Sequence, residues 1–240
     1  MYNPIDLSKK TENIVINGKM KKYYRFRPTR FYGGIATADT VGCNLRCKFC
    51  WSSNSVWNAK NAGRLYSPEQ VAETLLETAN KKGYHQVRIS GGEPTIGRQH
   101  LITLLENISP NFLFILETNG ILLGADKTYV AELSKFQNLH VRVCLKGCTP
   151  EEFSWLTGAS KGFEYQLKAL EKLRDKKMKF NIALVSTKKE RQELTKKLIE
   201  MDLGSIMLEE EEIILYPQVR KRLESEGILH RFKCYDSTKY

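Results

Sequence analysis

Three cysteines stand close together early in the chain, in a pattern suited to holding a metal centre. Cys43, Cys47 and Cys50 lie within eight residues, so their thiolates can converge from a single loop. A structural zinc site needs four ligands, and the nearest candidate for a fourth, His85, is far along the sequence. An iron–sulfur cubane held by only three thiolates leaves one iron open to another ligand. The spacing therefore favours a [4Fe–4S] cluster, with zinc and coincidental core cysteines as alternatives.

A glycine-rich motif follows the second predicted strand, residues 86–90. Gly91 and Gly92 are followed by Glu93 and Pro94. Paired glycines let the backbone approach a ligand closely, and a carboxylate can accept hydrogen bonds from an ammonium group. The same four residues could instead form an ordinary turn.

Polar residues also follow the next predicted strands along the chain. Thr118 and Asn119 come at the end of strand 112–118, and Lys146 comes at the end of strand 140–145. A lysine there could hold a carboxylate as a point charge. Asn-Gly is also a common turn dipeptide, so the second motif is weak by itself.

These motifs require elements that bring strand ends together. Apolar runs alternate with segments of helical period, which predicts an α/β protein with a parallel sheet. Eight β/α units need about 250 residues, so we expect an incomplete, six-stranded barrel or an open sheet, with its chemistry at the carboxyl ends of the strands. The predicted strands are 35–41, 86–90, 112–118, 140–145, 179–185 and 212–216, and the predicted helices are 68–82, 99–107, 125–136, 163–177 and 188–201.

Composition and charge set the class of protein. The 240 residues include 41% hydrophobic and 27% charged ones, which is typical of a soluble globular chain. We find no apolar run long enough to span a membrane and no secretory signal, so we expect a cytoplasmic protein with reduced thiols. The three expected regions are a basic N-terminal extension (1–33), the barrel (34–216) and a C-terminal helix or tail (217–240).

The net charge of +11 is concentrated toward the two ends of the chain. Aromatic residues interleave with arginines near the N-terminus and could stack on RNA bases, or could form a strand or arm that packs on the barrel. They are Tyr23, Tyr24, Phe26, Phe31 and Tyr32. The acidic run at residues 209–212 is interpreted as a solvated turn.

The cysteine motif C-x3-C-x2-C, with Phe49 before the last cysteine, resembles the signature of the radical S-adenosylmethionine (radical SAM) superfamily. The segment CNLRCKFC is most similar to its activating-enzyme branch, which includes pyruvate formate-lyase activating enzyme. The GGEP, TNG and LKG segments match that branch in order, over about residues 35–216. The chain departs from the branch at Cys144, where an aspartate is usual.

The resemblance implies a partial (β/α)6 TIM-like barrel, a [4Fe–4S] cluster on the three cysteines, and S-adenosylmethionine (SAM) on its open iron. It further implies reductive cleavage of SAM to a 5′-deoxyadenosyl radical that abstracts hydrogen from a substrate, with an external one-electron donor of the flavodoxin or ferredoxin type. The implied SAM contacts are Phe49, Gly91, Gly92, Glu93, Pro94, Thr118, Asn119, Lys146 and Asn181.

The other three cysteines are Cys144, Cys148 and Cys234. They are too few for a second cluster unless a ligand comes from outside the chain. Cys144 and Cys148 lie at the expected reaction end of the barrel and are candidates to supply a hydrogen atom or a thiolate. The alternative is that both are buried as small hydrophobic side chains.

The substrate stays open at this point. Activation of a glycyl-radical partner protein is the main interpretation, and modification of RNA or of a small biosynthetic metabolite is the alternative. A non-enzymatic zinc or iron–sulfur interaction module explains the cysteines but not the other motifs.

Overall fold

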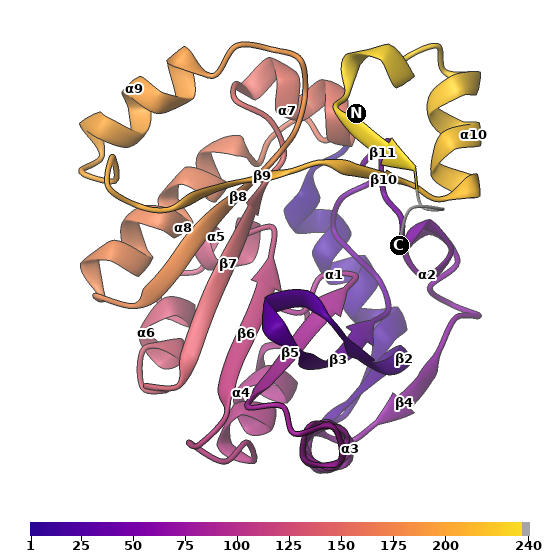
Figure 1. Cartoon of the computed structure of the whole chain (residues 1–240), viewed down its shortest axis with the longest axis vertical. Helices are drawn as coiled ribbons and strands as arrows, with labels where there is room; N and C mark the ends of the chain where they lie inside the picture. The colour runs from indigo at the N-terminus through magenta and orange to yellow at the C-terminus, as the bar shows by residue number, and fades with distance from the viewer. Residues whose placement is uncertain (237–240) are drawn as a thin grey trace.

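A sheet of nine strands runs through the computed structural model, which describes residues 1–236. Six neighbouring strands of this sheet are parallel and follow the order of the chain, with helices packed outside them (Figure 1). They are β3 (Ile35–Thr40), β5 (Gln86–Gly91), β6 (Leu113–Thr118), β7 (Leu139–Leu145), β8 (Lys179–Val185) and β9 (Leu208–Glu211). The predicted α/β class and the partial barrel of six parallel strands are confirmed.

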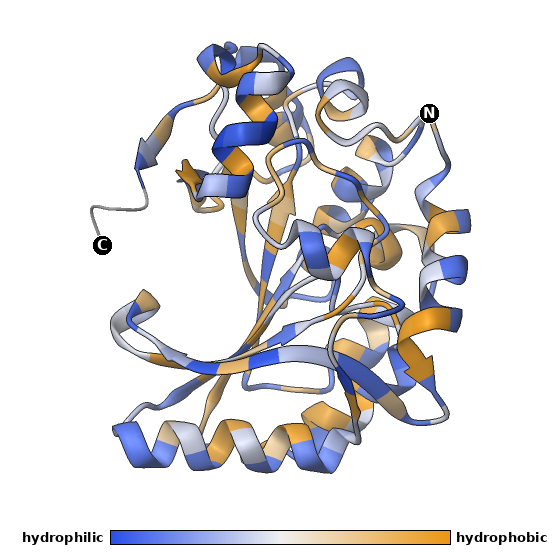
Figure 2. Cartoon of the chain, turned by 90° about the vertical axis from the view of Figure 1, so that its right-hand side faces the viewer, coloured by the Kyte–Doolittle hydropathy of each residue, from blue (hydrophilic) through white to orange (hydrophobic). Residues whose placement is uncertain are grey.

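The connecting segments carry the helices on the outside of the sheet. Figure 2 shows the apolar residues gathered along the strands and on the helix faces turned toward them. The helices are α2 (Ser53–Trp57), α3 (Pro68–Lys82), α4 (Arg98–Glu106), α5 (Ile121–Ala125), α6 (Tyr129–Leu133), α7 (Pro150–Thr157), α8 (Phe163–Asp175) and α9 (Gln192–Glu200). No helix of the described region combines the length and the apolar character that a membrane span requires.

Helix α3 shows how the sequence sets its own boundaries. Ser67 and Gln70 form a reciprocal capping box at its start, and Pro68 occupies the first turn. Gly83 ends the helix in a left-handed conformation (φ 68°). These signals placed the predicted helix at the residues where it is found.

The predicted helix 125–136 is too long, because only α6 (Tyr129–Leu133) forms within this range and α5 already ends at Ala125. Asp126 ends α5, and its side chain accepts hydrogen bonds from the backbone N–H of Thr128 and of Tyr129 at the start of α6. The carboxylate therefore stabilises a non-helical turn between α5 and α6, where the apolar spacing indicated a continuous helix.

The N-terminal segment is part of the same sheet. It forms α1 (Pro4–Val15), β1 (Ile16–Asn17) and β2 (Met20–Thr29), and β2 pairs antiparallel with β1, β3 and β4 (Arg64–Tyr66). The boundary expected at residue 33 thus falls between two paired strands, beside the short helical turn η1 (Phe31–Gly33). The interpretation of the aromatic stretch as a packed strand is confirmed for residues 20–29.

The sixth parallel strand is not the predicted one. The predicted strand 212–216 instead contains β10 (Ile213–Leu215), which pairs with β11 (Cys234–Asp236) in a separate two-stranded sheet. Strand β9 completes the sheet instead. It was not predicted because it carries no apolar pattern: its carboxylates pair with a buried arginine inside the barrel. Helix α10 (Pro217–Ser225) and the turn η2 (Leu229–Arg231) lie between β10 and β11 in the chain.

Candidate functional site

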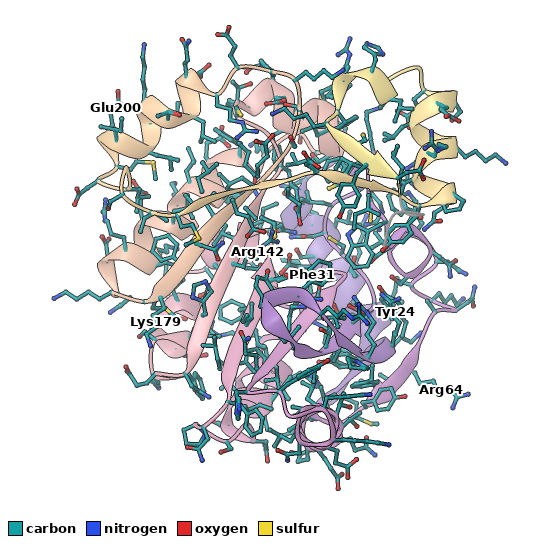
Figure 3. The ribbon with its side chains drawn as sticks, in the orientation of Figure 1. Tyr24, Phe31, Arg64, Arg142, Lys179 and Glu200 are labelled. Carbon is teal, nitrogen blue, oxygen red and sulfur yellow. The ribbon has the colours of Figure 1, made fainter. Side chains whose placement is uncertain are left out.

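A pocket of about 1270 Å³ opens at the carboxyl ends of the parallel strands, where catalytic sites of such folds occur. Arg142 and Phe31, both on its wall, lie near the middle of Figure 3, whereas Lys179 and Glu200 lie at the periphery. The structure brings together on this wall most of the residues singled out from the sequence: Cys43, Cys47, Cys50, Phe49, Gly91, Gly92, Glu93, Thr118, Asn119, Cys144 and Lys146.

The three cysteines of the motif line the pocket from the loop between β3 and α2. The pKa of each thiol is raised to about 12, mainly by burial, with a smaller contribution from the charge of a neighbouring cysteine. No three His, Cys, Asp or Glu side chains of the described chain stand in the close arrangement that surrounds a metal ion. The cysteine loop (residues 43–50) has no helix or strand, so its thiols can turn toward one centre.

A buried polar atom beside Cys43 lacks a partner. Asn44 is fully buried, and its Oδ1 accepts a hydrogen bond from Asn119 Nδ2 at 2.7 Å. Its Nδ2 has no hydrogen-bond partner within residues 1–236. A buried donor without an acceptor is costly, so a group that brings acceptors to this place stabilises the loop. Three thiols of this kind and an adjacent free donor fit an iron–sulfur cluster.

The paired glycines serve contact between two backbone segments. A Cβ at Gly92 would lie 2.0 Å from the Gly42 carbonyl oxygen, and one at Gly91 would lie 2.8 Å from Thr40 N. The Gly92 N–H donates to Thr40 O at 2.8 Å, and the Glu93 N–H donates to Gly42 O at 2.7 Å. The sequence predicted that the glycines allow the backbone to lie close to a ligand. In the structure they also allow it to lie close to the segment that leads into the cysteine loop.

The Glu93 carboxylate is buried and already satisfied by the chain itself. Its Oε1 accepts from Thr95 N, from Thr95 Oγ1 and from Thr118 Oγ1, the last two at 2.6 Å. Its Oε2 accepts from Asn119 N at 2.8 Å. The carboxylate therefore links the end of β5 to the end of β6, and its oxygens are less available to an ammonium ligand than the sequence indicated.

Lys146 lines the pocket directly after the end of β7. Its Nζ is 5.6 Å from the centre of the Phe49 ring and 3.9 Å from Glu211 Oε2. Burial alone would lower its pKa, but the charges of Cys144, Glu211 and Cys47 raise it above its ordinary value. A charged ammonium whose one ion pair within residues 1–236 is long is suited to bind an anionic group in the pocket.

Paired charges fill the rest of the barrel interior. Arg88 donates to Glu117 at 3.0 Å, and Arg142 pairs with Glu209 at 2.9 Å and with Glu211 at 3.2 Å. The two arginine side chains are only 6% exposed. Each buried guanidinium thus has a carboxylate partner from another strand, β6 for Arg88 and β9 for Arg142, as buried charges require.

The acidic run was not predicted to reach the site. It lies largely in β9, and the interpretation as a solvated turn is wrong because Glu209 and Glu211 bond with Arg142 inside the barrel. The signal that could have found these residues is a charge at alternate positions near strand ends, since alternate residues face the same side of a strand. Arg88, Glu117 and Arg142 also interrupt otherwise apolar strands.

Helix α10 supports the cysteine loop from outside. Arg222 donates to the carbonyl oxygens of Lys48 and Cys50, and Lys48 forms an ion pair with Glu226. These contacts join residues more than 170 positions apart. No motif in the sequence indicated them.

Three predicted site residues lie away from the pocket wall. Asn181 accepts a hydrogen bond from His140 Nε2 at 2.8 Å and donates to Glu209, deeper in the sheet. Cys148 is buried, and its backbone N–H donates to Glu152. Pro94 turns its carbonyl oxygen toward Lys21, behind the glycine loop (residues 91–97). Cys144 and Cys148 are thus not equivalent, since only Cys144 faces the pocket.

Part of the chain matches known proteins. The chain is 32% identical over 133 residues to the probable GTP 3′,8-cyclase of Thermococcus kodakarensis, covering 55% of this chain and 40% of that protein. It is 31% identical over 103 residues to the 7-carboxy-7-deazaguanine synthase of Methanothermobacter thermautotrophicus, covering 43% and 39%. The chain therefore spans about 40% of the length of these curated relatives.

Solved structures share the fold. Streptococcus suis SuiB bound to precursor peptide SuiA superposes with a TM-score of 0.58 at 23% identity, over 84% of this chain and 42% of that chain. TYW1 with a lysine-pyruvate adduct gives a TM-score of 0.53 at 18% identity, over 74% and 64%. At these identities the likeness shows a common architecture.

The expected activating-enzyme branch is not supported, because the curated relatives named above are a cyclase and a synthase. The family-level resemblance is confirmed. A family model described as the radical SAM superfamily matches residues 38–199, which include the cysteine loop and five of the six parallel strands in whole or in part. Members of this family use a [4Fe–4S] cluster and SAM, and the chain belongs to the radical SAM superfamily.

Proposed function

We propose that this protein is a radical SAM enzyme that acts on a small biosynthetic metabolite. The observation that carries the proposal is the single pocket wall that unites the three thiols, the glycine loop and a set of buried charges. A cluster and SAM bound there supply reductive cleavage of SAM and abstraction of hydrogen from a substrate. The protein orients both and keeps water out.

The chain's residues divide between the two cofactors. Cys43, Cys47 and Cys50 hold the cluster. Phe49 and Lys146 would hold SAM from one side of the pocket, and the Lys146 ammonium would pair with its carboxylate. The other side of the SAM site is formed by Gly91, Gly92, Glu93, Thr118 and Asn119. Because the Glu93 carboxylate is engaged internally, we assign it to shaping this side and assign no cofactor contact to Asn181.

A small metabolite is favoured over an RNA or a partner protein. The named relatives include a GTP 3′,8-cyclase and a 7-carboxy-7-deazaguanine synthase, whose names describe chemistry on small molecules. Residues 20–29 of the basic and aromatic stretch that could have held RNA are engaged in the sheet, where Tyr23 is buried and Arg25 and Arg27 pair with the buried Asp39. Phe31 and Tyr32 follow this strand and line the pocket. Activation of a glycyl-radical protein finds no support among these relatives.

The cofactor assignment is tested by anaerobic reconstitution. The parent chain should take up about four irons with matching sulfide, and with dithionite it should convert SAM to 5′-deoxyadenosine. Cys43→Ser, Cys47→Ser and Cys50→Ser should each lose the cluster, while Cys234→Ser, at a half-buried cysteine outside the pocket, should keep it. Stoichiometric zinc in place of iron, or a loaded parent that forms no 5′-deoxyadenosine, would refute the assignment.

The substrate class is tested with the same loaded enzyme. GTP is the first probe, with 7-deazaguanine precursors and bulk tRNA as comparisons. A small molecule that accelerates 5′-deoxyadenosine formation and is itself consumed supports the proposal. Acceleration by tRNA alone contradicts it. A flavodoxin or ferredoxin that replaces dithionite would identify the class of electron donor that we propose as partner.

A further inference from the structure

A lysine on strand β2 is completely enclosed behind the glycine loop. Lys21 is 1% exposed. Its Nζ donates to the carbonyl oxygens of Glu93 at 3.2 Å, Pro94 at 2.8 Å and Ile96 at 2.6 Å. Three backbone groups that follow directly after Gly92 thus converge on a single side chain.

The number of donors matches the number of acceptors. A charged ammonium carries three N–H donors, whereas a neutral amine carries two. An enclosed charge is retained only when it is paired and hydrogen-bonded. Burial lowers the pKa of Lys21 to about 7, and the nearby negative charge of Glu93 opposes that shift. The three contacts are therefore those of the protonated side chain.

The loop that Lys21 contacts has little regular structure of its own. Residues 92–97 connect β5 to α4 without helix or strand. On the pocket side, Gly92 and Glu93 donate to the Thr40 and Gly42 carbonyls. On the far side, the carbonyls of this loop point to Lys21. The loop is thus held between the approach to the cysteine loop and the N-terminal strand.

The surroundings of Lys21 are packed to receive it. Gly97 has a φ of +82°, and a Cβ there would lie 2.3 Å from Ile16 Cδ1 and 4.0 Å from Lys21 Cδ. His100 Nδ1 hydrogen-bonds to the Lys19 carbonyl at 2.8 Å. The β1–β2 hairpin therefore covers the back of the glycine loop with close contacts.

We propose that Lys21 is a positioning residue for SAM binding, because its ammonium fixes the orientation of the loop at residues 92–97. The inference rests on the proposed function, in which this loop forms one side of the SAM site. Lys21 itself lies outside the pocket wall. Its loss removes the ammonium from the Pro94 and Ile96 carbonyls and leaves the Glu93 carbonyl with the 3.3 Å bond from Ile96 N, which frees the loop to change shape.

The test uses the full chain, loaded anaerobically with its cluster. Lys21→Met removes the charge and keeps an unbranched stem, Lys21→Gln keeps a shorter polar group, and Lys21→Arg keeps the charge. The matched control is Lys22→Met: Lys22 is the next residue of β2 and donates to the Ala59 and Lys60 carbonyls, away from the loop. Iron content, melting temperature, Kd for SAM by equilibrium dialysis, and kcat and KM for 5′-deoxyadenosine formation are measured.

We expect Lys21→Met to weaken SAM binding about 10-fold or more, the size of a lost charged hydrogen bond, with iron content retained. KM for SAM should rise by more than kcat falls. Lys21→Gln should be intermediate, Lys21→Arg should recover part of the affinity, and Lys22→Met should match the parent. If Lys21→Met does not fold, Lys21→Gln decides.

Two failures are distinguishable. Lys21→Met and Lys21→Gln proteins that bind SAM as tightly as the parent overturn the positioning role and leave the proposed function standing. A loaded parent that binds no SAM overturns the proposed function and the inference together. A third outcome also overturns the positioning role of Lys21: a loss of iron in Lys21→Met that Lys21→Arg does not restore. The defect would then lie in the cluster site.

Discussion

Glu93 Oε1 accepts a hydrogen bond from Thr118 Oγ1 at 2.6 Å, and this bond joins the ends of two adjacent parallel strands. Both residues came from motifs that the sequence placed beside SAM. The structure adds that they bond to each other before any ligand is considered. The carboxylate is 1% exposed and also accepts from Thr95 and Asn119.

Glu93→Gln should destabilise the protein even without cofactors. The amide places N–H donors opposite donors of Thr95, Thr118 or Asn119, so buried groups are left unpaired, at a cost of about 2–4 kcal/mol. Urea unfolding of the cofactor-free chain measures this, with Glu106→Gln at an exposed position of α4 as control. Unchanged stability would mean that the carboxylate serves a ligand and not the strand ends.

Acid should destabilise the fold through His100. Burial lowers its pKa from 6.5 to about 4, so between these values the unfolded chain binds more protons than the folded one. Stability present above pH 6.5 is lost as the pH falls toward 4, by about 3 kcal/mol.

Unfolding curves for His100→Asn at several pH values measure this effect. The variant should lose most of this pH dependence, while His85→Asn, at an exposed position, should keep it. An equal slope in the parent and in His100→Asn would contradict the assignment.

Removal of Arg142 should leave the carboxylates of Glu209 and Glu211 without their main cation. The guanidinium is 6% exposed, whereas the Glu209 and Glu211 side chains are 39% and 34% exposed, so solvent can replace part of the lost interaction. We expect a loss of about 1–2 kcal/mol, below the roughly 3 kcal/mol of a fully buried pair. Lys197→Met, which removes an exposed pair with Glu193 on α9, should cost less than about 0.5 kcal/mol. Denaturant titration compares the two variants. A similar small loss in both would show that the interior pairs contribute no more than surface ones.

We predict that Cys144, which lines the pocket, supplies a hydrogen atom to the reaction. Its Sγ lies 3.3 Å from Arg142 Nη1. In D2O without substrate, a thiol that donates its exchangeable atom should place deuterium in 5′-deoxyadenosine. Mass spectrometry should show several-fold less deuterium in the product of Cys144→Ala, and the parental amount in that of Cys148→Ala. Equal incorporation in Cys144→Ala would remove Cys144 as a hydrogen donor.

The parts of the fold that the sequence predicted have local causes. Strands β3, β5, β6, β7 and β8 are apolar runs, because both faces are covered or turned inward. Helix α3 carries its own start and stop signals. The cysteine, glycine and TNG motifs follow strands, so their meeting at one end of the sheet follows from parallel topology alone.

The parts that could not be predicted depend on distant partners. Strand β9 is acidic because Arg142 from β7 faces it. Strand β2 joins the sheet through β3 and encloses Lys21 against a loop more than 70 residues away. Arg222 reaches the cysteine loop from α10. In each case the residue type is explained by a contact with a distant part of the chain, which exists only in the folded protein.

The chain-ordered sheet divides the pocket residues between two stretches of the chain. Strands β3, β5 and β6 carry the cysteines, the glycine loop and the TNG segment, all before residue 121, whereas Arg142, Cys144, Glu209 and Glu211 come from β7 and β9. Apart from Lys146, the groups that we assign to the cofactors come from one stretch of the chain. Arg142, Cys144, Glu209 and Glu211 come from the stretch that follows it. Replacing the second stretch would keep the cysteines and the glycine motif in place but would also replace Lys146 together with Arg142 and Cys144.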